Sequence, residues 1–285
     1  ITDGTYGAVG LDFKSPHTGL AAKKVWFFFD KTYVCLGTDI SSRMKNQVLT
    51  TVNQCLLNGQ VTVSDADGIH PQERGSRMKK GVRWVVHDRV GYYFLNKENV
   101  ILSNQRTEGS WKIANRQTTT PTDIIQQDVF TLSVDHGSYP NNEGYAYMVV
   151  PSADPLSIEK QVEEEGVVVL ANCPDVQAVR HDGLNMAYAV FYKGGTLRIH
   201  DKIVVEMDAP GMLMVKYNDA GEILTLGVSD PTRFMKKLHL SVNQRIVGTA
   251  QENIQTEWDG KQALTRISVD LPQNEYAGKS VIYNK

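Results

Sequence analysis

Apolar and polar positions along this chain follow the two-residue period of β-strands much more often than the period of a helix. The strongest signal lies at residues 25–29 and 33–36, two apolar and aromatic runs separated by Asp30 and Lys31. Such runs on either side of a short polar turn are typical of a β-hairpin. Because residues 26–29 are consecutive large apolar side chains, we expect both faces of this hairpin to be covered, as in the centre of a large sheet.

Short strand-like runs continue along the chain, with turn-rich intervals between them. In the first part we expect strands at residues 5–13, 48–57, 81–94, 100–102, 111–113, 130–134 and 145–150, the last two paired across the turn at 136–144. In the second part we expect strands at residues 167–170, 177–180, 186–192, 196–199, 202–206, 212–217, 223–228, 237–242, 262–269 and 279–283. No long helix alternates with these strands, so the pattern predicts an all-β fold that ends in a β-sandwich.

Two segments break the strand pattern. Residues 64–80 contain two glycines, one proline and several basic side chains, which predicts an exposed loop. Residues 155–165 begin with Pro155, have apolar residues four apart and are followed by Gly166, which predicts a short helix.

Composition sets limits on the class of protein. A chain of 285 residues with 41% apolar content is long enough for one large or two medium domains, and we place the boundary near the short helix, giving residues 1–163 and 164–285. The formal net charge of -2 provides no overall field for nucleic acid or an anionic membrane surface. Cysteines are too few for a disulfide framework, and we expect buried thiols at Cys35 and Cys55.

The densest positive cluster consists of Arg74, Arg77, Lys79 and Lys80. A guanidinium group binds a carboxylate or sulfate in a bidentate arrangement. We therefore predict that these four residues contact an acidic glycan. The alternative is a solvated loop with no ligand.

Three other groups of polar residues are weaker candidates. Residues 65–68 begin like a calcium loop but lack the later acidic positions of an EF-hand, and we interpret them as a turn. His87 and Asp88 end a strand with no recognisable nucleophile nearby, which favours packing or turn capping over a general base. Residues 135–137 are interpreted as an ordered turn whose side chains bond to the backbone. The sequence therefore yields no catalytic residue and no metal site.

The hairpin stretch AKKVWFFFD…VCLGTDIS resembles a segment of the β-rich half of family 8 polysaccharide lyases. This family includes chondroitin AC, hyaluronate and xanthan lyases, and the similarity to the chondroitin AC lyases is greatest. Five further segments are similar to family segments and follow the family's order, at residues 3–13, 50–59, 87–94, 134–151 and 170–192.

The resemblance implies an antiparallel supersandwich of the galactose-mutarotase type up to about residue 160, followed by a smaller C-terminal β-sandwich. It also implies a secreted or periplasmic parent enzyme that cleaves acidic glycosaminoglycans by β-elimination. In the family the catalytic residues lie on a helical toroid, and no segment here matches the motifs that bear them. The resemblance therefore implies a non-catalytic half that walls the substrate cleft and supports that helical domain.

Cofactors and alternatives follow from the same resemblance. We expect no cofactor in this chain, with calcium possible in the full-length parent. A chain that opens on Ile1 in a turn-like ITDG is expected to be a piece of a longer polypeptide. A second hypothesis is a stand-alone carbohydrate-binding or interaction module, and a third, less favoured, is an independent sugar-modifying enzyme. We expect neither nucleic acid nor membrane as a partner.

Overall fold

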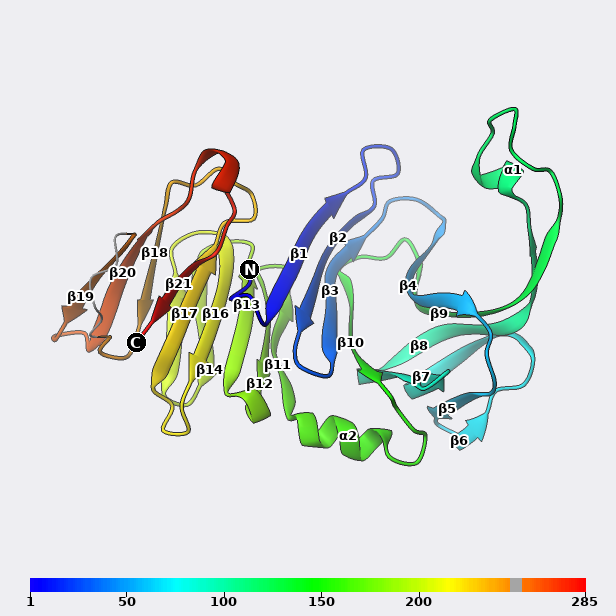
Figure 1. The fold of residues 1–285 in the computed structure, drawn as a ribbon, viewed down its shortest axis with the longest axis horizontal. Helices are drawn as coiled ribbons and strands as arrows, with labels where there is room; N and C mark the ends of the chain where they lie inside the picture. The colour runs from blue at the N-terminus through cyan, green and yellow to red at the C-terminus, as the bar shows by residue number, and fades with distance from the viewer. Residues whose placement is uncertain (247–252) are drawn as a thin grey trace.

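The structure, a computed structural model, describes residues 1–246 and 253–285, and the described part of the chain is built almost entirely of antiparallel strands (Figure 1). The strands form three sheets, of ten, six and five strands. Figure 1 shows the sheets following one another along the long axis of the molecule. The predicted all-β fold is confirmed.

The first sheet has the strand order β1-β2-β3-β10-β8-β7-β5-β6, and β9 and β4 continue from β8 as a second branch. Its strands are β1 (Gly7–Lys14), β2 (Ala21–Phe28), β3 (Tyr33–Ser41), β4 (Gln47–Leu56), β5 (Val61–Asp65), β6 (Gly68–Pro71), β7 (Gly75–His87), β8 (Val90–Gly109), β9 (Ile125–Ser138) and β10 (Glu143–Pro151).

The second and third sheets form a sandwich. The second sheet contains β11 (Val167–Cys173), β12 (Val176–His181), β13 (Met186–Phe191), β16 (Gly211–Tyr217), β17 (Ile223–Ser229) and β21 (Val281–Asn284). The third contains β14 (Gly195–His200), β15 (Ile203–Met207), β18 (Lys237–Val242), β20 (Leu264–Asp270) and β19 (Ile254–Asp259). β19 was not predicted, because its QTEWD segment is mostly polar and lacks an apolar run.

The predicted hairpin is present as β2 and β3, with Val25 opposite Leu36 and Phe27 opposite Val34. β3 lies between β2 and β10, so it is a central strand. Phe27 is fully buried whereas Phe28 is 42% exposed. The hairpin is therefore covered on both faces at β3, but only one face of β2 is fully buried.

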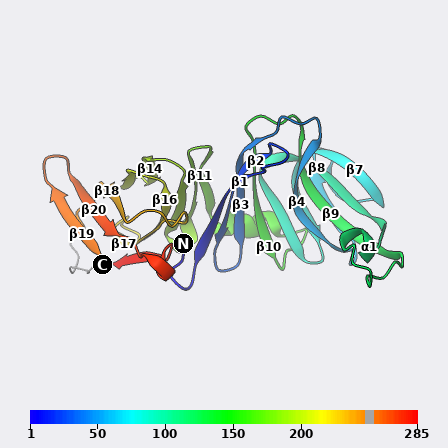
Figure 2. The same cartoon turned by 90° about the horizontal axis from the view of Figure 1, so that it is seen from above.

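The buried apolar side chains form three cores, two between neighbouring sheets and one on the remaining side of the first sheet. One face of the first sheet packs on the second sheet, where the rings of Phe27 and Tyr188 lie 6.1 Å apart. The opposite face of the second sheet packs on the third through residues such as Leu213 and Val269. A third core, with Phe94 and Phe130, fills the other side of the first sheet, which Figure 2 shows curving round. Because the first two sheets share a core, the two parts of the chain are joined by packing as well as by the linker.

Helices are few among the described residues. α2 (Ile158–Glu165) begins three residues later than the predicted helix, because the Asp154 carboxylate accepts the Leu156 N–H at 2.8 Å and holds a turn there. Gly166 ends the helix in the left-handed region, with φ of 61°, as its position predicted. No helix in the described ranges is long and apolar enough to cross a bilayer.

Three local predictions were wrong. Residues 111–113 form α1 (Trp111–Ala114), where the Ser110 hydroxyl accepts the Lys112 N–H, rather than a strand. Residues 64–80 are not a loop: β5 and β6 form a hairpin there, and the first residues of β7 pair with β8. β9 pairs with β4 and β8 instead of β10. β10 is buried on both faces and lies between β3 and β8, so its two edges are already taken.

Candidate functional site

The four basic residues predicted to bind an acidic glycan lie at the β6–β7 connection and along β7. Arg77 and Lys79 point to the same face of β7, since they are two residues apart, and Lys80 points to the other. Arg74 lies just before the strand. The structure therefore brings Arg77 and Lys79 together and separates them from Lys80.

Most of this positive charge is paired with carboxylates. Arg74 lies 2.7 Å from Asp128, Arg77 lies 2.6 Å from Glu73, and Lys79 lies 2.9 Å from Asp65. The exposed pairs of Arg74 and Arg77 contribute little to stability. In all three pairs the carboxylate competes with an incoming anion for the basic group. Among the described residues, Lys80 has no carboxylate partner within ion-pair distance.

Asp65 is the buried centre of this region, with its side chain only 6% exposed. Its oxygens contact Nε2 of His70 at 3.1 Å and Nζ of Lys79 at 2.9 Å, and one accepts the Asp67 N–H at 3.0 Å. Burial alone would raise the pKa of Asp65, but the hydrogen bonds from Lys79, His70 and the Asp67 N–H outweigh it and hold the pKa below its usual value. Asp65 thus fixes Lys79 and His70 in place.

Arg77, Lys79 and His70 line a shallow hollow of about 400 Å³ beside this buried carboxylate. Its remaining walls are Pro71, Gln72 and Glu73. A hollow of this size lies within the range of small-ligand sites. Arg77 and Lys79 are thus the part of the predicted set that the structure assembles around a cavity.

His87 is a packing residue. Its Nε2 accepts the Asn58 N–H at 3.0 Å and its ring stacks on Phe130 at 4.3 Å. The backbone donor leaves the proton on Nδ1, which lies 3.7 Å from Sγ of Cys55. Burial lowers the pKa of His87, although Asp88 opposes the shift. Because Nδ1 already carries a proton, it cannot accept the proton of the Cys55 thiol. Cys55 and His87 therefore do not form a nucleophile and its general base.

Asp135 and His136 order a turn. Asp135 accepts the Gly137 N–H at 2.9 Å, and Nε2 of His136 lies 2.9 Å from the Thr50 hydroxyl. Burial lowers the pKa of His136 to about 4, although the charge on Asp135 opposes the shift. His136 is therefore a neutral side chain that stabilises the turn through its hydrogen bond with Thr50.

One carboxyl group with a shifted pKa, that of Glu98, was not predicted from the sequence. Glu98 lies on β8 opposite Val82, where the pairing of β7 with β8 shifts register. Burial raises the pKa of Glu98 to about 7, against a hydrogen bond from the Ala146 N–H and with the support of Glu143. No local pattern marks this residue, because its environment comes from strands distant in the sequence.

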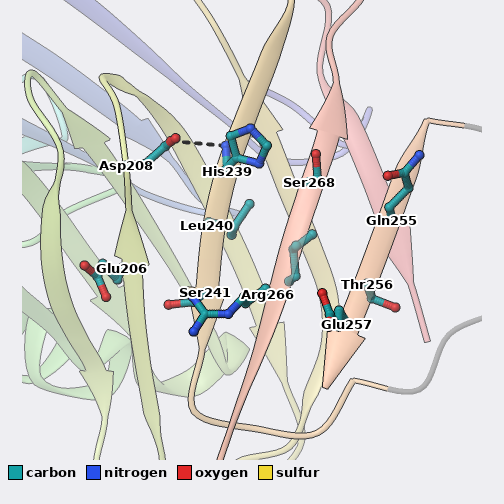
Figure 3. A pocket seen from close by; sticks show the side chains of 11 residues that line it. Glu206, Asp208, His239, Leu240, Ser241, Gln255, Thr256, Glu257, Arg266 and Ser268 are labelled. Atoms are coloured by element: carbon teal, nitrogen blue, oxygen red, sulfur yellow. Dashed lines mark hydrogen bonds between the residues drawn. The ribbon is translucent and has the colours of Figure 1, made fainter. Parts of the chain in front are cut away.

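A larger hollow, of about 670 Å³, lies on the outward face of the third sheet (Figure 3). Its polar lining comes from four neighbouring strands, with Glu206 and Asp208 at one side and Gln255 and Glu257 at the other. Among the described residues no group of three or more His, Cys, Asp or Glu side chains is arranged to hold a metal ion.

Comparison with known proteins identifies the family. Residues 1–162 match the super-sandwich domain of polysaccharide lyase family 8, and residues 168–239 match the family's C-terminal beta-sandwich domain. The chain belongs to polysaccharide lyase family 8. The resemblance seen in the sequence is thereby confirmed.

Individual relatives agree with this assignment. The chain is 35% identical to chondroitinase-AC of Pedobacter heparinus over 99% of its own length and 37% of that protein. It is 28% identical to xanthan lyase of Bacillus sp. (strain GL1) over 81% of this chain and 25% of that protein. A solved structure of chondroitinase AC lyase matches with a TM-score of 0.83 at 34% identity, over 99% of this chain and 39% of that one. The chain thus spans between a quarter and two fifths of the length of these relatives.

Proposed function

We propose that this chain is the β-rich, non-catalytic half of a lyase that cleaves acidic glycosaminoglycans of the chondroitin or hyaluronan type by β-elimination. The observation that carries the proposal is the 35% identity to chondroitinase-AC over 99% of the chain. The solved chondroitinase AC lyase that is 34% identical to this chain was studied in complexes with oligosaccharides, which supports a saccharide substrate.

The chemistry of β-elimination argues for a supporting role. The reaction needs a group that neutralises the uronate carboxylate, a base for the proton on C5 and an acid for the leaving oxygen. The two histidines weighed in the sequence, His87 and His136, are buried, have lowered pKa values and are bonded to structural groups. We infer that a helical toroid domain of the same parent supplies the catalytic groups, while this half walls the cleft.

The hollow beside β7 is our proposed contact for the acidic chain. Arg77 and Lys79 face it. Lys80, which has no carboxylate partner among the described residues, adds an ammonium group on the opposite face of the strand. A substrate sulfate or carboxylate has to compete with Glu73 for Arg77. We therefore expect this contact to steer and orient the glycan, with only a modest share of the binding free energy.

Two further features of the parent belong to the proposal. We propose a secreted or periplasmic parent, since its polymeric substrate is extracellular. Calcium in the full-length parent is also part of the proposal, and among the residues that the structure describes no group of three or more His, Cys, Asp or Glu side chains is arranged to hold a metal ion.

The test measures unsaturated uronate products by their absorbance. The full-length parent, this chain alone, the helical half alone and a mixture of the halves are each incubated with chondroitin and hyaluronan. We expect product from the full-length parent and none from this chain alone. Lyase activity of the isolated chain, or a parent with no activity on either polymer, would overturn the proposal.

A further inference from the structure

The outward face of the third sheet carries two rows of polar side chains across its strands. In one row Glu206, Ser241, Arg266 and Glu257 are cross-strand neighbours on β15, β18, β20 and β19. The next row contains His239, Ser268 and Gln255, with Asp208 at its end. Figure 3 shows both rows around one hollow.

The hollow follows from the sizes of these side chains. Ser241 and Ser268 lie half-buried at the middle of the two rows, and longer side chains stand on either side of them. The small residues leave a space of about 670 Å³, within the range of ligand sites. The other central residues of the two rows are Arg266 and His239, so each row has one short and one long side chain between its ends.

Several polar groups in the hollow are free to bind a ligand. No hydrogen bond from the described residues reaches the carboxylates of Glu206 and Glu257 or the side-chain amide of Gln255. Arg266 is oriented by Gln262 at 2.6 Å and Asp259 at 3.3 Å. The hollow thus has carboxylate acceptors at both margins, Glu206 and Glu257, and the guanidinium donor of Arg266 between them.

Charge and spacing limit what the hollow can bind. Three carboxylates, Glu206, Asp208 and Glu257, face a single guanidinium, that of Arg266, so the net charge of the lining repels a polyanion. Glu206 and Glu257 are separated by three strand spacings, which is about 14 Å, too far to hold one cation between them. An elongated, uncharged ligand with many hydroxyl groups fits both limits.

We propose that this hollow binds a neutral polysaccharide, a different polymer from the acidic substrate of the proposed lyase. The marginal carboxylates accept hydrogen bonds from sugar hydroxyls, and Arg266 donates to ring or hydroxyl oxygens in the middle. The choice of a saccharide among polyhydroxyl ligands rests on the proposed function. The site is separate from the basic hollow at β7, which would contact the acidic substrate of the lyase.

Titration calorimetry on the whole 285-residue chain tests the proposal with three hexamers: neutral chitohexaose, anionic chondroitin hexasaccharide and cationic chitosan hexamer. We expect saturable binding of chitohexaose. Ser241→Trp fills the floor of the hollow and is expected to weaken that binding roughly tenfold or more. Thr51→Trp, on an exposed position of β4 in the first sheet, is the matched control and is expected to leave it unchanged.

A second variant keeps the test valid if Ser241→Trp does not fold. Glu206→Ala combined with Glu257→Ala removes two exposed marginal carboxylates and is expected to weaken chitohexaose binding while leaving the thermal midpoint unchanged. The proposal would be overturned if chitohexaose did not bind, if only the chitosan hexamer bound, or if Ser241→Trp bound chitohexaose as well as the parent protein. It would also be overturned if the chain formed a dimer that Ser241→Trp dissociates, because the hollow would then be an interface between two copies. The calorimetry measures binding and the product assay measures lyase activity. A parent that makes no unsaturated product would therefore contradict only the lyase proposal.

Discussion

The side-chain amide of Asn172 donates a hydrogen bond to the backbone carbonyl of Gly37 at 3.1 Å. The same amide group donates to the carbonyl of Tyr145 at 3.0 Å, and its oxygen accepts from Gln177 at 2.8 Å. Gly37 and Tyr145 lie on neighbouring strands of the first sheet, whereas Asn172 lies on β11 of the second. One amide side chain thus ties the two parts of the molecule together.

Replacing Asn172 by Ala is expected to lower the free energy of unfolding by about 2 kcal/mol, because two partly buried carbonyls lose their donor. Chemical denaturation of both proteins measures the difference. Asn96→Ala, at an exposed position of β8, is the control and should stay within about 0.5 kcal/mol of the parent. Equal effects of the two substitutions would show that Asn172 does not join the two parts.

Gly37 must lack a side chain because the Tyr145 ring occupies the space. A Cβ at Gly37 would lie 2.1 Å from Cε1 of Tyr145, and Tyr145 is almost fully buried. Gly37→Ala is therefore expected to cost about 2 kcal/mol or more in unfolding free energy as the packed ring is displaced. Gly195→Ala, where no atom lies within 4 Å of the added carbon, provides the comparison. An unchanged thermal midpoint for Gly37→Ala would contradict this steric account.

Local chemistry was enough to predict the hairpin of β2 and β3 and the end of α2 at Gly166. In each case the signal lies within a few residues, in consecutive aromatic side chains or in a glycine that accepts a left-handed backbone. Strand pairing was less accessible. The partners of β9 are set by which strands have a free edge in the finished sheet, and no short stretch of sequence carries that information.

The candidate sites show the same limit. The cluster of Arg74, Arg77, Lys79 and Lys80 was visible in the sequence, but the pairing of Arg74 with Asp128 joins residues 54 positions apart. The outer hollow of the third sheet needs the register of four strands. Serines and carboxylates scattered over about 60 residues gain meaning as a site only once that register is known.

Lys79 is expected to contribute to stability more than its neighbour Lys80. Lys79→Ala leaves the nearly buried Asp65 carboxylate with His70 as its remaining side-chain partner, at a cost of about 1–2 kcal/mol at neutral pH. Lys80→Ala changes an exposed side chain and is the matched control, expected within about 0.5 kcal/mol. Urea denaturation compares the two.

The pH dependence of the Lys79 effect follows from Asp65. Its pKa is lowered in the folded state, so its contribution is present above the ordinary pKa of about 3.9 and is lost as the pH falls through the folded value. The difference between Lys79→Ala and the parent protein should therefore shrink below about pH 4. A difference that stays constant down to pH 3 would assign the effect to lost packing of the lysine stem.

Glu98 is expected to make the protein less stable as the pH rises. Its pKa is about 7 when folded and about 4.3 when unfolded, so the folded state binds more protons between these values. Stability falls across that window and levels off above pH 7. Glu98→Gln removes the penalty, and its advantage should grow from near zero at pH 4 to about 1–2 kcal/mol at pH 8, after allowance for solvent screening at a partly exposed site.

Thermal melts of the Glu98→Gln variant and the parent protein at pH 4, 6 and 8 measure this advantage. Glu275→Gln, at an exposed position, is the control and should show no advantage that grows with pH. A constant difference between Glu98→Gln and the parent at all three pH values would mean that Glu98 ionises at its ordinary pKa in the folded protein. The local shift in register between β7 and β8 would then leave the carboxylate open to water.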